Sequence, residues 1–161
     1  MIDSVEFAKY VISRVKNYNS THEEDTISLG ETKLQKLIYI CDGYMNASNV
    51  NFISENVRAW NYGPVYPRVH KWAETYGDLL AQNELCTDDS LKQIAEVKAE
   101  PLVDRVIEMY GHETAQTLSL WSHRPGSPWE KALERGHGKM NSLIEKSDMG
   151  DYFRGLLSES V

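Results

Sequence analysis

Residues 32–45, Thr-Lys-Leu-Gln-Lys-Leu-Ile-Tyr-Ile-Cys-Asp-Gly-Tyr-Met, form the most regular stretch of the sequence. Thr32 and Gln35 have the spacing of a capping box, which predicts that a helix starts here. Lys33 and Lys36 fall outside its apolar face, so we expect both side chains to be exposed. The apolar face itself follows the i, i+3, i+4, i+7, i+11 pattern of an amphipathic helix through Leu34, Leu37, Ile38, Cys41 and Met45.

Helical signals continue on both sides of this stretch. Ser4 is a good N-cap for a first helix, and Pro67 fits the first turn of a third helix that ends by Gly77. Pro101 opens a helix that Gly111 ends. Ser127, Pro128 and Glu130 together mark the start of another. Further helices are expected at about 88–94, at 113–123 and from Asp148 onward.

Between residues 46 and 62 the helical period disappears. Val57–Trp60 alternates apolar and polar residues, which is typical of a short strand, and Gly63-Pro64 is a turn signal. The sequence therefore predicts a mainly α fold. We expect one compact domain over residues 1–161, a bundle of six to seven short helices with at most one short β-hairpin near residues 50–62.

Composition excludes several classes of protein. The net charge of −7 disfavours nucleic acid as a partner, because a phosphate backbone is neutralised by clustered Lys and Arg. No apolar run has the length of a membrane span, and Met1-Ile2-Asp3-Ser4 does not resemble a signal peptide. Cys41 and Cys86 lie far apart and lack a Cys or His at ligand spacing. We therefore expect a cytoplasmic protein with two unpaired thiols.

Few residues suggest chemistry. The glycines form no phosphate-binding loop, and no two of the histidines and cysteines have metal-ligand spacing. Ser119, Ser122 and His123 are close in sequence, but no strained nucleophile turn surrounds them. We expect no cofactor, no metal and no enzymatic activity.

Two segments are unusual for loops. Arg58–Pro67 combines Trp60, Tyr62 and Tyr66 with two prolines and an arginine, residue types that anchor protein interfaces. The alternative is that these aromatics fill the core between two helices. His123–Trp129 contains two prolines and a glycine, which predict a sharp reversal with Trp129 packed beneath it. There we expect His123 to hydrogen-bond a loop carbonyl.

These segments also carry a family resemblance. Lys33-Leu34-Gln35-Lys36-Leu37-Ile38-Tyr39 resembles the Lys-Leu-Gln-Lys-Leu-Leu-Tyr helix of the Panacea antitoxin domain, a family that includes SocA-like antitoxins and GepA-type phage-associated proteins. Ala59–Pro67 is similar to the family's Ala-Trp-x-Tyr-Gly-Pro-Val-x-Pro element, and Leu118–Trp129 to its late His and Pro-Trp element. The motif residues expected to be structural are Leu34, Gln35, Leu37, Tyr39, Gly63, Pro64, Pro67, His123, Pro128 and Trp129.

The resemblance implies a function by binding. A Panacea-type protein is expected to be the antitoxin of a type II toxin–antitoxin system that neutralises a cognate toxin directly, and some members deliver the toxin to a protease. The alternative is a DNA-binding autoregulator of a mobile-element operon, against which the acidic charge counts. The residues that we expect to contact the partner are Lys33, Lys36, Arg58, Trp60, Tyr62 and Tyr66.

Overall fold

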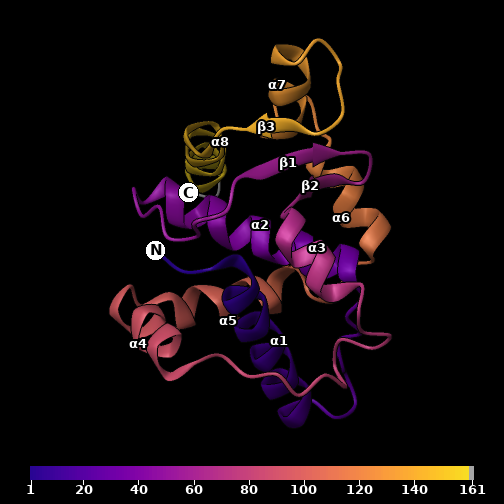
Figure 1. Ribbon diagram of the computed structural model, residues 1–161, viewed down its shortest axis with the longest axis vertical. Helices are drawn as coiled ribbons and strands as arrows, with labels where there is room; N and C mark the ends of the chain where they lie inside the picture. The colour runs from indigo at the N-terminus through magenta and orange to yellow at the C-terminus, as the bar shows by residue number, and fades with distance from the viewer. Residues whose placement is uncertain (160–161) are drawn as a thin grey trace.

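In the computed structural model, which describes residues 1–159, the chain forms eight helices and three short strands (Figure 1). The mainly helical prediction is confirmed, although the eight helices exceed the predicted six to seven and a third strand joins the hairpin. In chain order the elements are α1 (Ser4–Thr21), α2 (Glu31–Ala47), β1 (Val57–Trp60), β2 (Gly63–Val65), α3 (Pro67–Ala73), α4 (Asp88–Glu96), α5 (Ala99–Tyr110), α6 (Ala115–Ser122), α7 (Pro128–Arg135), β3 (Ser142–Ile144) and α8 (Lys146–Glu159).

Helix α2 is the centre of the molecule. It buries 13 of its 17 residues and contacts α1, α3, α5, α6, α8 and β2, so its neighbours surround it on all sides (Figure 1). A helix that is buried all round needs apolar residues beyond one face, and Tyr39 and Ile40 supply them opposite the predicted stripe. The most extensive contact is with α8, where Gly43 lets the ring of Phe153 approach the α2 backbone.

The three strands form one antiparallel sheet in the order β2-β1-β3. The predicted hairpin exists, but it lies at residues 57–65, so the boundary of 50–62 was too early. Gly63-Pro64 is not the turn: both residues belong to β2, and the turn is Asn61-Tyr62. Strand β3 was not expected, because its three residues lie in a polar segment and are too few to show the alternation of apolar and polar residues that predicts a strand.

Two predicted helix starts are wrong in detail. Asp3, not Ser4, is the N-cap of α1, because its carboxylate accepts the Val5 amide at 2.8 Å. Gly30 occupies the N-cap of α2, so Thr32 and Gln35 form no capping box. Three other predicted signals are confirmed: Ser127 caps α7, Gly111 ends α5, and Pro67 begins α3, although α3 ends at Ala73 and not at Gly77. Pro101 and Asp148 were each predicted two residues late, because α5 begins at Ala99 and α8 at Lys146.

The expected exposure of the two α2 lysines is wrong. Lys33 and Lys36 are 7% and 1% exposed, because α2 has no solvent face along this turn. Each ammonium group is satisfied by main-chain carbonyls: Lys33 Nζ donates to the carbonyl oxygens of Ser28 and Gly111, both at 2.9 Å. The Lys33 side chain therefore ties α2 to the end of α5, and burial lowers its pKa.

A buried polar cluster joins α2 to α8. Asp42 is fully buried and accepts hydrogen bonds from the Tyr66 hydroxyl at 2.6 Å and the Asn46 amide at 2.9 Å, and it pairs with the Lys146 ammonium. Burial raises the pKa of the Asp42 carboxyl, and these three partners oppose the rise. The cluster fixes the entry of α8 against the middle of α2.

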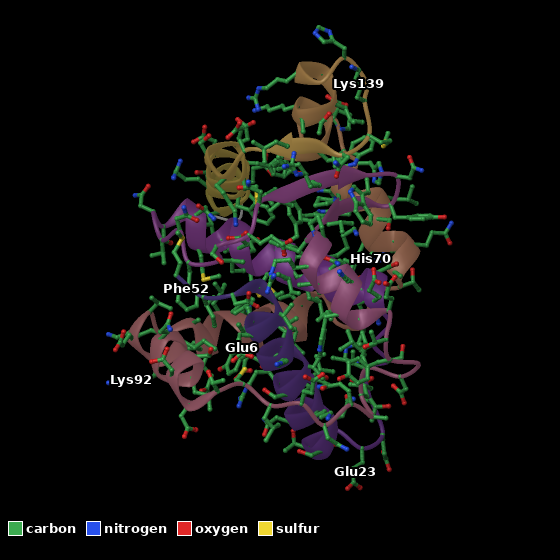
Figure 2. All side chains as sticks on the ribbon, in the orientation of Figure 1. Glu6, Glu23, Phe52, His70, Lys92 and Lys139 are labelled. Carbon is green, nitrogen blue, oxygen red and sulfur yellow. The ribbon has the colours of Figure 1, made fainter. Side chains whose placement is uncertain are left out.

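Side chains fill the space between the elements, and the exposed Lys139 and Glu23 lie at opposite ends of the long axis (Figure 2). Cys41 is buried on α2 and Cys86 is half-buried, and both are free thiols. Within residues 1–159, no helix combines the length and the apolar character that a membrane crossing requires.

Candidate protein interface

The turn of the β1–β2 hairpin requires a glycine at its exit. Gly63 has a φ of +112°, a conformation that other residues rarely adopt. A Cβ at this position would also lie 2.4 Å from the Ser122 hydroxyl oxygen and 2.7 Å from Lys36 Cε. Gly63 therefore allows the hairpin to seat directly on α2 and α6.

Side chains of the α6–α7 segment hold the turn by its backbone. Three consecutive main-chain carbonyls, those of residues 60, 61 and 62, each accept one hydrogen bond from that segment. Three anchored carbonyls in succession leave this turn little freedom to move. The donors are Trp129 Nε1 to Trp60 (2.8 Å), His123 Nε2 to Asn61 (2.9 Å) and Ser119 Oγ to Tyr62 (2.9 Å).

Helix α2 holds the second half of the hairpin. The Gln35 amide accepts from the Tyr66 main-chain N–H at 2.9 Å and donates to the Tyr66 carbonyl at 3.2 Å. Lys36 Nζ donates to the Pro64 carbonyl at 3.2 Å. Burial lowers the pKa of Lys36 to about 8, and the nearby Glu31 carboxylate opposes this shift.

The His123 imidazole links α6 to the hairpin turn. Its Nε2 faces the Asn61 carbonyl and its Nδ1 faces the Ser119 carbonyl, while the ring centroid lies 3.9 Å from that of Trp129. The predicted hydrogen bond to a loop carbonyl and the packing of Trp129 beneath the turn are both confirmed. The Ser122 hydroxyl donates to the Ser119 carbonyl, 2.7 Å away, so it too is hydrogen-bonded to the main chain. Among residues 1–159, no three His, Cys, Asp or Glu side chains gather as metal ligands would.

The six predicted contact residues separate by exposure. Lys33 and Lys36 are buried, and so is Tyr66, whose hydroxyl is bonded to Asp42; none of these three can reach a partner. Arg58 and Trp60 are half-buried, and both donate to Asn141 beside β3. Tyr62 is the exception, with 72% of its surface exposed. It does not fill the core, which removes that alternative for this residue.

Two further apolar residues flank Tyr62 and were missed by the sequence reasoning. Leu120 on α6 and Met140 before β3 are 67% and 46% exposed. Tyr62 and Leu120 both line a hollow of about 600 Å³, and Tyr62 and Met140 both line another of about 470 Å³. We call the surface formed by Asn61, Tyr62, Leu120 and Met140 the Tyr62 face. For Leu120 the signal was present, because it is a large apolar residue outside the inward positions of α6.

Comparison with known proteins identifies a family for this chain. The family model described as "Antitoxin SocA-like, Panacea domain" matches residues 34–130, more than half of the chain. The chain belongs to the SocA-like Panacea family. Among curated proteins, Antitoxin SocA of Caulobacter vibrioides is 26% identical over 112 residues. That match covers 65% of this chain and 60% of the relative's length. No solved structure matches significantly.

The segment that matches the Panacea model contains the hairpin and every side chain described above as holding it. Four residues of the quoted motifs therefore hold the hairpin through its backbone: Gln35, Lys36, His123 and Trp129. Tyr62 is the motif residue that this scaffold presents to solvent. Met140 lies outside the matched segment, so one flank of the Tyr62 face comes from the part of the chain beyond it.

The pKa of Lys36 predicts a pH-dependent stability. Its folded-state pKa of about 8 lies below the ordinary 10.5, so in this window the unfolded chain binds the proton more tightly than the folded chain. The free energy of unfolding attributable to Lys36 should rise with pH between these values, by up to about 1.4 kcal/mol per unit.

Urea denaturation of the wild type and Lys36→Met at about pH 7.5 and 9.5 checks this expectation. Burial raises the pKa values of Cys41 and Tyr66, so both groups favour a stability that falls as the pH rises. Their contributions are the same in both proteins and cancel when the two free energies of unfolding are subtracted. The stability of the wild type relative to the variant should increase by about 2 kcal/mol across the interval. An unchanged difference between the two proteins contradicts the assignment.

Proposed function

We propose that this chain is the antitoxin of a type II toxin–antitoxin pair and that it neutralises its toxin by binding it directly through the Tyr62 face. The observation that carries this proposal is an aromatic side chain, 72% exposed, on a turn whose three carbonyls are all anchored. Large aromatics on a rigid backbone bind well because they bury much area and lose little entropy. The family and the SocA relative support a toxin as the partner.

Co-expression with the product of the adjacent gene tests the proposal. Growth arrest by the neighbour alone, relieved by this chain with recovery of a stable complex, is the expected result. A toxic neighbour that this chain neither relieves nor binds overturns the proposal. DNA binding at the upstream region, without any protein complex, would favour the autoregulator alternative.

Tyr62→Ala should weaken the complex by about 2 kcal/mol or more, roughly 30-fold in Kd, because it removes the central aromatic of the face. The melting temperature should stay within a few degrees of the wild type, since the ring is exposed. Leu91→Ala is the matched control: Leu91 is 44% exposed on α4, at the other end of the molecule (Figure 1). Calorimetric titration with the purified partner measures the Kd of both variants. Equal losses for the two variants would contradict a role of Tyr62.

Neutralisation by binding alone and delivery to a protease differ in the fate of the toxin. Under the proposal, the half-life of the toxin in cells is unchanged or longer when this chain is co-expressed. A half-life that shortens with this chain, and recovers in Tyr62→Ala, would mean that the same interface serves delivery. Pulse-chase labelling of the toxin distinguishes the two routes.

A further inference from the structure

Both hollows of the Tyr62 face are electrically neutral. Among the residues that the structure describes, no Asp, Glu, Lys or Arg lines either of them. The walls of the larger hollow, about 600 Å³, come from the hairpin turn, from α6 and its approach, and from Thr32 in the first turn of α2. Although the chain has a net charge of −7, this surface therefore offers a partner no charge to pair with.

The charged side chains of α2 and β1 are bound elsewhere. The Glu31 carboxylate accepts a hydrogen bond from His70 Nδ1 at 2.8 Å. Lys36 is buried beneath the hairpin, where it donates to a main-chain carbonyl. Arg58 donates to the Asn141 carbonyl, 3.4 Å away. None of these charged groups lines a hollow of the Tyr62 face.

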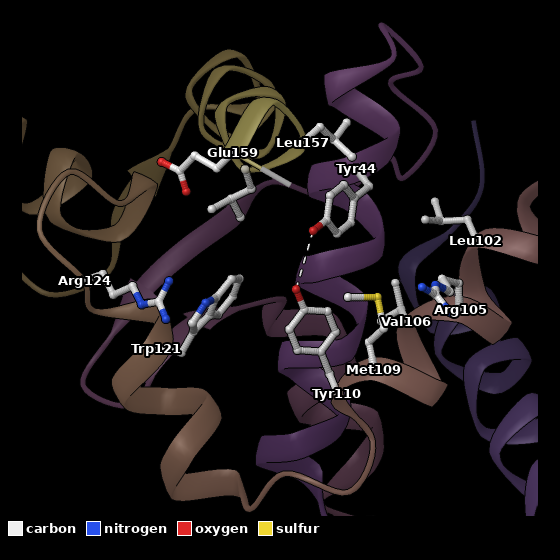
Figure 3. A pocket seen from close by; sticks show the side chains of 11 residues that line it. Tyr44, Leu102, Arg105, Val106, Met109, Tyr110, Trp121, Arg124, Leu157 and Glu159 are labelled. Carbon is white, nitrogen blue, oxygen red and sulfur yellow. Dashed lines mark hydrogen bonds between the residues drawn. The ribbon is translucent and has the colours of Figure 1, made fainter. Parts of the chain in front are cut away.

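The charges at the two ends of α6 line neighbouring surfaces. Glu113 and Arg124 line a hollow that reaches Leu120 from the α5 side. Arg124 also lies over the Trp121 ring, 5.7 Å from its centroid, at the edge of the groove between α5, α6 and α8 (Figure 3). Lys139, on the approach to β3, is exposed but lines neither hollow of the Tyr62 face. Polar recognition inside these hollows therefore depends on hydrogen bonds between neutral groups.

Three neutral polar side chains in the larger hollow have no hydrogen-bond partner in the described part of the chain: Thr32, Asn61 and Gln116. The remaining polar groups there are engaged, because the Ser119 hydroxyl and both His123 nitrogens face main-chain carbonyls. Asn61 also lines the smaller hollow, so its amide lies where the two hollows meet. A side-chain amide carries a donor and an acceptor, so it matches a partner group that offers both.

A contact inside the protein shows what such an amide recognises. Gln35 accepts from the main-chain N–H of Tyr66 at 2.9 Å and donates to the carbonyl of the same residue at 3.2 Å. Tyr66 is extended, with φ of −98° and ψ of 104°. The N–H and C=O of an extended residue point to the same side of the chain, whereas a helix bonds both groups internally. A free amide therefore fits extended main chain and does not fit a helix.

We propose that the larger hollow binds an extended segment of the partner by its main chain. The Asn61 and Gln116 amides pair with N–H and C=O groups of this segment, and one of its apolar side chains lies between Tyr62 and Leu120. Successive side chains of an extended segment point to opposite sides, so the residues on either side of this apolar one face away from the hollow. The inference rests on the proposed antitoxin function and adds the form in which the partner presents itself.

Overlapping peptides of about 12 residues from the product of the adjacent gene test the inference by fluorescence anisotropy with the full-length chain. One stretch should bind saturably. N-methylation of one main-chain amide in that peptide removes an N–H, leaves every side chain unchanged, and should weaken binding by about tenfold. Gln116→Met should weaken the unmodified peptide by about tenfold, and in this variant the same N-methylation should have little further effect.

Gln93→Met is the matched control, since it makes the same change on α4 at the other end of the molecule (Figure 1). Circular dichroism checks that both variants keep their helices. The inference is overturned if N-methylation is tolerated at every position, or if Gln116→Met binds as tightly as the wild type or only as weakly as Gln93→Met. It is also overturned if the whole partner forms a complex that Tyr62→Ala weakens, yet no peptide binds. A toxic partner that forms no complex overturns the proposed function itself, so the two failures are distinguishable.

Discussion

Replacing Asp42 by alanine should lower the free energy of unfolding by about 3–5 kcal/mol. The change leaves the Lys146 ammonium without its counter-charge, although the Lys146 side chain is only 18% exposed. It also leaves the buried Tyr66 hydroxyl without its acceptor. Burial of the Asp42 charge is itself unfavourable and raises the pKa of its carboxyl. The expected loss of stability therefore comes from the buried Lys146 and Tyr66 groups that no longer have a partner. Urea denaturation measures the change.

Two variants accompany this measurement. Asp42→Asn keeps an oxygen that can accept from Tyr66 and should therefore cost less than Asp42→Ala. Asp151→Ala removes a carboxylate from an exposed pair with Arg154 on the same helix, α8, and should cost less than about 1 kcal/mol. If Asp42→Ala costs no more than Asp151→Ala, the buried cluster does not hold α2 and α8 together.

The contact between Gly43 and Phe153 should show strong coupling in a double-mutant cycle. Phe153 is fully buried, so Phe153→Ala should cost about 3–5 kcal/mol. Gly43→Ala places a Cβ 2.3 Å from two carbons of that ring and should cost about 1–3 kcal/mol through overpacking. With the ring removed, the same Gly43→Ala should be neutral or should stabilise α2 by about 0.5–1 kcal/mol, the ordinary helical preference for alanine.

Gly155→Ala is the matched control for this cycle. Gly155 lies on α8 near Phe153, but a Cβ there meets nothing within 4 Å, so the change should be neutral or slightly stabilising. Thermal unfolding of the single and double variants provides the comparison. Additive effects of Gly43→Ala and Phe153→Ala would contradict the close approach of α8 to α2.

Local sequence signals located most of the helices. Ser127 at a helix start, Gly111 at a helix end and the apolar spacing through Leu37 all act within a few residues, so they are readable without the fold. The burial of Lys33 and Lys36 could not be predicted in this way. Lys33 and Lys36 look solvent-facing on α2 alone, and the carbonyls that accept from them belong to segments up to 78 residues away.

The candidate interface was predictable only in part. The density of aromatics in Arg58–Pro67 indicated Tyr62, because that signal is local. Tyr66 belonged to the same pattern, yet its hydroxyl meets Asp42 in the core, a contact between residues 24 apart. Leu120 and Met140 join the Tyr62 face only through the packing of α6 and the β3 approach around the hairpin, which no local pattern records.

Amide hydrogen exchange of this chain, alone and with the purified product of the adjacent gene, tests the central claim most directly. The proposal predicts new protection in residues 59–63, 115–123 and 139–141, which form the Tyr62 face and its supports, and none in α1 or α4. A complex that protects α1 or α4 and leaves the hairpin turn unchanged would contradict the claim that the partner binds through Tyr62. A toxic partner that forms no complex would contradict direct neutralisation itself.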